Sequence, residues 1–122
     1  MTRRARHGER GAATAELAVV MPMLVALTIG LVWLLAVGSA QVRTVDAARE
    51  TARAVARGDA DAAAMAHGRQ VAPSGSRITV VSSGQDVTVT VRATVAGPGG
   101  LFAGFPAARV RATAVAATEE TS

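Results

Sequence analysis

Few residues in this sequence are of the types that carry out acid–base, metal or nucleophilic chemistry. His7 and His67 each lack a second histidine or a cysteine at metal-ligand spacing, and the chain has no cysteine at all. The glycine-rich stretch 97–100 has no lysine and precedes no expected helix, so it does not predict a phosphate-binding loop. Asp59 and Asp61 lack the further ligands of a calcium loop and fit a helix N-terminus instead. We therefore expect a protein that is not an enzyme and holds no metal or cofactor.

The placement of Glu16 is the one chemical feature that needs an explanation. It stands directly before a run, Leu17 to Val42, that contains no charged residue. About 20 apolar residues span a bilayer core, so this run predicts a transmembrane helix in contact with the lipid bilayer. It exceeds the roughly 7–15 apolar residues of a secretory signal. One account of Glu16 is simple: an acid in the first turn of a helix gains about 0.3–1 kcal/mol from the helix dipole.

The net charge of +4 is concentrated at the N-terminus, where residues 1–11 hold four arginines and one glutamate. A basic segment directly before an apolar run predicts a single-pass membrane protein with its N-terminus in the cytoplasm and its C-terminal region outside. This distribution does not favour a nucleic-acid partner. The small residues at 38–40 leave a rival open, in which a signal peptide is cut after Ala40 and a secreted chain starts at Gln41.

The helical pattern continues beyond the apolar run. Its apolar positions recur every three or four residues, as on one face of an amphipathic helix: Val45, Ala48, Ala52 and Val55. Asp46–Arg49 and Glu50–Arg53 place opposite charges at i, i+3, where ion pairs are worth a few tenths of a kcal/mol. We expect one helix from about Ala13 to Arg57.

Glycines and acids predict where the helices end. Gly58 suits a left-handed helix cap, and Asp59 could cap the next helix. That second helix is predicted over residues 60–69, ending at Gly68. Residues 73–76, Pro-Ser-Gly-Ser, predict a turn.

Strand-like alternation follows in the last third of the chain. Residues 78–82 predict one strand, and residues 87–95 alternate strictly between valine or alanine and polar residues. Residues 83–86 predict the hairpin turn between them, 97–106 a loop, and 109–117 a further strand. One valine face of this sheet must be covered, and the Val45–Val55 face of the helix is the expected cover.

These elements predict an α+β fold: a long N-terminal transmembrane and amphipathic helix, a short second helix, and an antiparallel sheet of two or three strands packed on the long helix. The expected organisation is a basic cytoplasmic leader (1–11), a transmembrane helix (12–42), an amphipathic extension (43–58) and a small extracytoplasmic α/β region (59–122).

The N-terminal half also resembles a known family. Arg10-Gly11, then a small residue, then glutamate at the fifth place of the remainder resembles the class III signal of type IV pilins. The run E-L-A-V-V-M-P-M-L with Pro22, and the exit segment A-R-E-T-A-R-A-V-A-R-G, resemble the TadE-like family of tight-adherence pilus proteins. The resemblance covers about residues 8–60.

The resemblance implies a minor pilin or pseudopilin-like subunit that is processed and then assembled. A prepilin peptidase would cut after Gly11, where the absence of a side chain permits close backbone approach. Ala12 would become the new N-terminus, and Glu16 would pair with that ammonium or with a neighbouring subunit's. Implied partners are other pilin and pseudopilin subunits and the membrane platform of pilus assembly.

Two features of the transmembrane segment fit assembly. Pro22 removes one helical hydrogen bond, and Gly30 follows Ala26 at the small-x-x-x-small spacing that lets helices approach closely. An ordinary alanine-rich membrane helix explains the spacing equally well. The rival from another class is an uncleaved single-pass protein, such as a receptor or sensor subunit.

Overall fold

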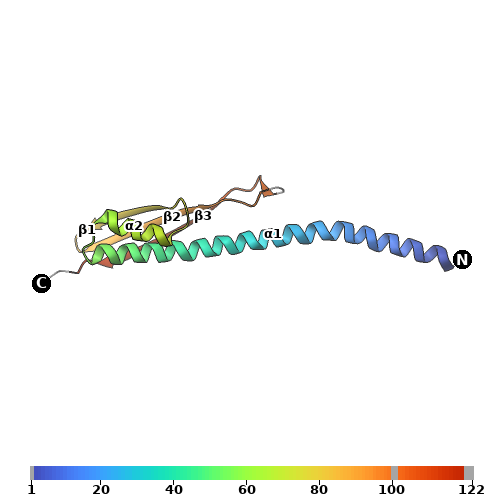
Figure 1. Cartoon of the computed structure of the whole chain (residues 1–122), viewed down its shortest axis with the longest axis horizontal. Helices are drawn as coiled ribbons and strands as arrows, with labels where there is room; N and C mark the ends of the chain where they lie inside the picture. The colour runs from blue at the N-terminus through green and yellow to red at the C-terminus, as the bar shows by residue number, and fades with distance from the viewer. Residues whose placement is uncertain (1, 100–101, 120–122) are drawn as a thin grey trace.

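The computed structural model describes residues 2–99 and 102–119, with side chains from residue 8 onward. The elements follow the order α1 (Thr2–Ala56), α2 (Asp61–Val71), β1 (Arg77–Ser83), β2 (Asp86–Val95) and β3 (Ala108–Ala117). The molecule is elongated: α2 and the sheet pack along the C-terminal half of α1, and the N-terminal half of α1 extends away alone (Figure 1). The predicted α+β fold is confirmed, with three strands in the sheet.

The helix α1 contains 55 residues, which at 1.5 Å per residue is about 80 Å. It begins at Thr2 and not near Ala13, so the basic leader is helical as well. The leader is rich in arginine, which is a good helix former. Gly8 and Gly11 each cost about 1 kcal/mol relative to alanine without ending the helix. Pro22 also lies inside α1.

The end of α1 confirms the predicted glycine cap. Gly58 has a φ of 96°, and its N–H donates to the carbonyl oxygen of Val55 at 2.9 Å. The N–H of Asp59 donates to the carbonyl oxygen of Ala54 at 3.1 Å, which completes a Schellman motif. The prediction that Asp59 caps α2 was wrong. The N-cap of α2 is Ala60, which makes no side-chain hydrogen bond, and the Asp59 carboxylate lies 3.8 Å from Arg57.

The sheet is an antiparallel meander in the order β1-β2-β3. Gly84, with a φ of 60°, turns the chain between β1 and β2. The alternation of β2 places its valines on one face, and Val87, Val89 and Val91 are at most 2% exposed. The buried face of β2 was therefore predicted correctly from the two-residue period, since successive side chains of a strand point to opposite faces.

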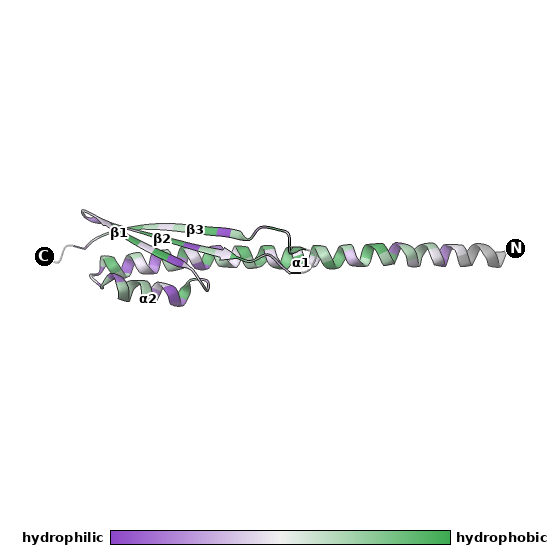
Figure 2. Cartoon of the chain, turned by 90° about the horizontal axis from the view of Figure 1, so that it is seen from above, coloured by the Kyte–Doolittle hydropathy of each residue, from purple (hydrophilic) through white to green (hydrophobic). Residues whose placement is uncertain are grey.

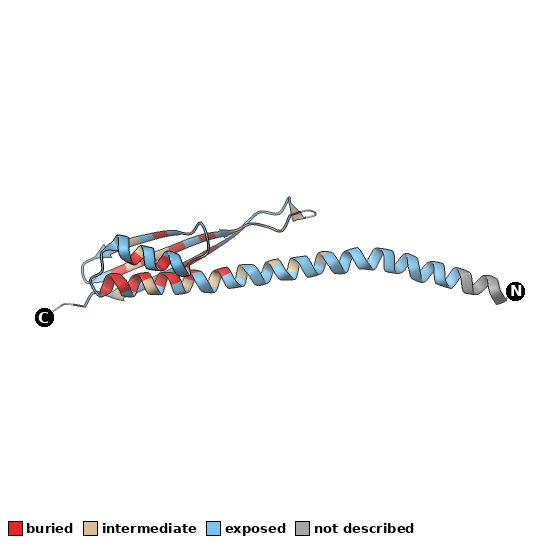
Figure 3. Cartoon of the chain, viewed as in Figure 1, coloured by how far each residue is buried: buried red, intermediate tan, exposed pale blue. Residues whose placement is uncertain are grey.

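The valine face packs on α1, as expected (Figure 3). Ala48, Ala52 and Val55 are all buried, and Val45 is partly buried. The buried part of α1 is wider than predicted, because α2 covers an adjoining sector that includes Ala47 and Thr51.

Gly68 is where α2 approaches α1 most closely. A Cβ atom at Gly68 would lie 2.0 Å from the Thr51 Oγ1 atom and 3.4 Å from the Ala47 carbonyl oxygen. The prediction that Gly68 ends the helix was wrong, since α2 continues to Val71. This glycine serves packing and not capping.

Arg43 joins the C-terminal end of α2 to α1. Its Nε atom donates to the Val71 carbonyl oxygen at 3.1 Å, and its Nη2 atom to that of Ala72 at 3.5 Å. Cations are favourable at helix C-termini, where carbonyl groups lack helical partners. The expected pairs Asp46–Arg49 and Glu50–Arg53 are not within 4.0 Å; among the described residues the only ion pair joins Arg57 and Asp59.

Candidate functional site

The most unusual surface of the molecule is the apolar N-terminal half of α1. The helix from Gly8 to Ala56 is long and apolar enough to cross a membrane, and its most apolar window has no buried residue. Large side chains stand in the open there, including Leu24 at 51%, Leu31 at 57% and Leu35 at 74% exposure. Figure 2 shows this stretch as a nearly continuous hydrophobic ribbon. Such a surface is stable only when lipid or protein covers it.

Gly11 and Glu16 both lie on exposed turns of α1. No atom would lie within 4 Å of a Cβ at Gly11. Glu16 forms no ion pair with any residue that the structure describes. Ala12 is four residues before Glu16, so the two lie one turn apart on the same side of the helix.

On the side of the apolar segment that faces the sheet, a stripe of residues is partly or fully covered. Its members follow one another at intervals of four and three residues: Ala26, Gly30, Trp33, Val37 and Ala40. Together with Gln41 they are the residues between 17 and 42 that are not exposed. Ala40 and Val37 pack under β2 and β3. The stripe therefore continues the sheet-covered face of α1 into the apolar segment.

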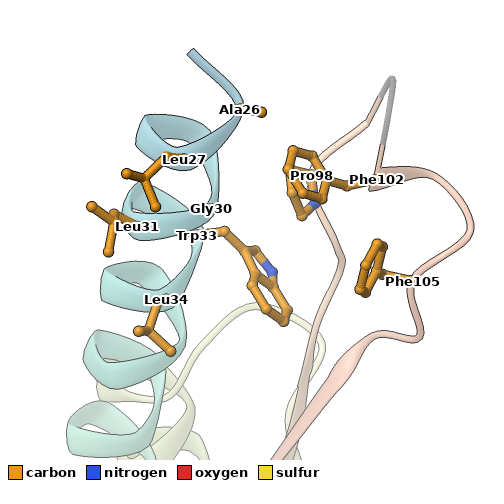
Figure 4. Close-up of a pocket in the computed structure, with 9 residues that line it drawn as sticks. All are labelled: Ala26, Leu27, Gly30, Leu31, Trp33, Leu34, Pro98, Phe102 and Phe105. Atoms are coloured by element: carbon orange, nitrogen blue, oxygen red, sulfur yellow. The ribbon is translucent and has the colours of Figure 1, made fainter. Parts of the chain in front are cut away.

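The β2–β3 loop, which the structure describes over residues 96–99 and 102–107, covers part of this stripe. The indole Nε1 of Trp33 donates to the carbonyl oxygen of Ala96 at 2.9 Å. Pro98, Phe102 and Phe105 face the helix, and Figure 4 shows Trp33 directed toward them. Between loop and helix lies an apolar groove of about 420 Å³, which we call the loop groove.

The docking of the loop on α1 was not predicted from the sequence. The available signal was composition: Trp33, Phe102 and Phe105 are all the aromatic residues of the chain. The small residues Ala26 and Gly30 line the loop groove. No atom would meet a Cβ at Gly30 within 4 Å, so the groove is open there.

One segment in the N-terminal part of the chain is similar to a known family. Residues 11–53 match the family model described as TadE-like protein. Over this segment the chain is similar to TadE-like proteins. No match is found among curated proteins or among solved structures.

The TadE-like segment begins at Gly11 and ends at Arg53, so it includes Glu16, Pro22, Gly30 and the covered stripe. It ends before α2 and the sheet. The same segment contains the part of α1 that is long and apolar enough to cross a membrane.

Proposed function

We propose that this TadE-like chain is a non-enzymatic minor pilin or pseudopilin-like subunit that is inserted with its N-terminus in the cytoplasm and its sheet outside. A prepilin peptidase removes residues 1–11 by cutting after Gly11. The observation that carries the proposal is Glu16, an acid without an ion-pair partner among the described residues, one helical turn beyond the new N-terminus on an otherwise apolar helix.

The electrostatic role of Glu16 follows from its surroundings. An isolated carboxylate at a helix–helix contact within a membrane or filament is costly. The cut creates an ammonium at Ala12, and pairing it with the Glu16 of a neighbouring subunit offsets the cost of both charges. Because that pairing is possible at one axial offset only, it also sets the register between adjacent helices.

Two further observations support processing and assembly. Gly8 and Gly11 lower the helix propensity around the cut, which favours local opening for a peptidase. The exposed apolar residues that follow would be covered by lipid before assembly and by the helices of other subunits in the pilus. Partners are therefore the peptidase, other pilins and pseudopilins, and the assembly platform.

The first experiment measures the N-terminal sequence and intact mass of the protein from cells with and without the peptidase. We expect a mature chain starting at Ala12 in the first case only. Gly11→Leu should retain the leader, while Gly8→Leu is the matched control and should be processed, since neither site is crowded. Retention of residues 1–11 in both strains would favour the uncleaved receptor or sensor subunit, and a chain starting at Gln41 would indicate secretion.

The second experiment separates processing from assembly. Glu16→Ala should be inserted and cleaved normally but should be absent from sheared pili. Glu9→Ala removes an acid that is lost with the leader, so it should assemble normally. Normal incorporation of Glu16→Ala would contradict the role of Glu16 in register.

A further inference from the structure

The position of the β2–β3 loop beside α1 has a direct bearing on the membrane. The Trp33–Ala96 hydrogen bond holds the base of the loop at the level of Trp33. Trp33 lies well inside the uncharged run that ends at Val42. At whatever depth Trp33 enters the bilayer, the loop therefore enters with it.

The chemistry of the loop fits an apolar environment. The sequence between Arg92 and Arg109 contains no charged residue. Phe105 is 62% exposed, although it is one of the largest apolar side chains of the chain. Pro98 and Pro106 have no N–H to satisfy, and the N–H of Phe105 donates to the Phe102 carbonyl oxygen at 3.0 Å. These features lower the cost of placing the backbone near lipid.

Backbone chemistry limits how deep the loop can lie. If the hydrocarbon core ended at Val42, Trp33 would be about 13 Å below its surface. That is close to the centre of a core about 30 Å thick. Irregular backbone exposed to lipid does not occur at such depth, because its N–H and C=O groups would lack partners. The core must therefore end closer to Trp33, which also suits the preference of tryptophan for the interface.

The exposed face of the sheet supports the same depth of the chain in the bilayer. Arg77, Arg92 and Arg111 are direct cross-strand neighbours on the exposed face of the sheet, and Arg109 is opposite Thr94 beside them. We call these four residues the arginine row. None of them is paired with an acid among the described residues. Like charges directly opposite one another destabilise a sheet, so the row has a cost without an anionic partner.

The arginine row has a fixed height above the loop. The side chain of Gln41 donates to the Arg111 carbonyl oxygen at 3.1 Å, so Arg111 lies at the level of Gln41. Eight residues of helix separate Gln41 from Trp33, a distance of about 12 Å. Headgroups occupy roughly 5–8 Å beyond each side of the core, and arginine side chains extend toward them. The row thus faces the phosphates when the loop is in the outer acyl region.

We propose that the β2–β3 loop and the arginine row together form a lipid-docking face, in which Phe102 and Phe105 insert into the outer leaflet and the arginines bind anionic phospholipid headgroups. The loop groove is then filled by an acyl chain. Because the loop also lies beside Gly30, about one helical turn deeper than Trp33, the hydrocarbon boundary lies between Gly30 and Trp33 and not near Val42, so that the apolar side chains of the loop enter the acyl region and most of its backbone does not. The proposal rests on membrane anchoring by α1 and is independent of cleavage at Gly11 and of pilus assembly.

Depth-dependent fluorescence quenching tests the proposal on the full chain in lipid vesicles. Because the chain has no cysteine, Phe105→Cys and Ser83→Cys each introduce one site for a fluorophore. Phe105 is on the loop, and exposed Ser83 is at the opposite end of the sheet. We expect spin-labelled lipids to quench the label at 105 strongly and the label at 83 not at all. The same lipids should place Trp33, the only tryptophan, near the boundary, about 15 Å from the bilayer centre.

Lipid charge tests the arginine row. Vesicles of phosphatidylcholine are compared with an equal mixture of phosphatidylcholine and phosphatidylglycerol. Near an anionic surface, each arginine increases the ratio of docked to undocked protein roughly fivefold. The double change Arg92→Gln and Arg111→Gln should therefore remove most of the gain that phosphatidylglycerol gives to quenching at 105. The matched control, Arg49→Gln and Arg53→Gln, lies on α1 away from the row and should keep that gain.

An unquenched label at 105, or a Trp33 within about 2 Å of the bilayer centre, would overturn the proposal. A label that is shielded from water only at high protein concentration would assign the loop to a second copy of the chain instead. If the protein bound a DNA duplex and phosphatidylglycerol had no effect on quenching at 105, the arginines would be assigned to nucleic acid instead. Leader cleavage and piliation, followed in the same variants, report separately on the proposed function.

Discussion

The close approach of α2 to α1 makes Gly68→Ala a sensitive test of the packing described above. Alanine normally stabilises a helix interior by about 1 kcal/mol relative to glycine. Here the new methyl group would overlap the Thr51 Oγ1 atom at 2.0 Å and press on Ile78 Cδ1 at 3.1 Å. Overpacking a well-filled core costs about 1–3 kcal/mol. We therefore expect a net loss of about 1 kcal/mol in the free energy of unfolding.

The Thr51 side chain cannot move aside without a loss of stability. Thr51 is fully buried, and its hydroxyl donates to the Ala47 carbonyl oxygen at 2.8 Å. Removing that side chain should reverse the sign of the effect. In a Thr51→Ala background, Gly68→Ala should stabilise the protein by up to about 1 kcal/mol, because helix propensity then outweighs the remaining contacts. The coupling between the two positions should be about 2 kcal/mol.

The assay is urea unfolding in detergent micelles, followed by far-ultraviolet circular dichroism, with wild type, both single variants and the double variant. A small domain has a denaturant slope near 1 kcal/mol per molar urea, so the midpoint of Gly68→Ala should fall by about 1 M. The apolar part of α1 stays helical in micelles and contributes a constant signal. A midpoint that rises for Gly68→Ala in the wild-type background would refute the close approach.

Three further results are expected. Gly58→Ala should lower the free energy of unfolding by about 1–2 kcal/mol, because an L side chain is strained at a φ of 96°. Val89→Ala should cost about 2 kcal/mol in urea unfolding, since Val89 is 0% exposed, whereas Val81→Ala, at 56% exposure, should change it by less than about 0.5 kcal/mol. Trp33→Phe should increase chymotrypsin cleavage of the β2–β3 loop several-fold in micelles, since the bond to the loop backbone is lost; Leu35→Ala, which lies 74% exposed, should not.

The sequence was sufficient for features that depend on local periodicity. The alternation from Val87 to Val95 identified the buried face of β2, and the three- and four-residue spacing from Val45 to Val55 identified the face of α1 beneath it. Gly58 was identified as a cap because its position follows the last residue of a helical pattern. In each case the relevant neighbours are close in the chain, so one pattern fixes the geometry.

Features that depend on distant contacts were missed or misassigned. Gly68 was interpreted as a helix end, because the sequence does not reveal that Thr51 packs against it. The arginine row was not predicted, because its members come from three strands and only the pairing register brings Arg77, Arg92 and Arg111 together. Residues 59–122 contain five arginines and five acids, so the charge counted along the chain is balanced, although one face of the sheet is strongly basic. The docking of the loop on Trp33 likewise joins residues more than sixty positions apart.

Helix α1 runs without interruption from Thr2 to Ala56, with Pro22 inside it. Between Glu16 and Ala26 the chain is helical throughout, so the number of residues in this stretch sets the angle around the helix axis between Glu16 and the sheet. Successive residues are about 100° apart around the axis. Inserting one residue in this stretch would rotate the sheet by about 100° relative to Glu16 while lengthening the helix by only about 1.5 Å. Inserting seven would restore the angle to within about 20°. A subunit that must engage partners at both ends would therefore tolerate many substitutions here but few changes in length.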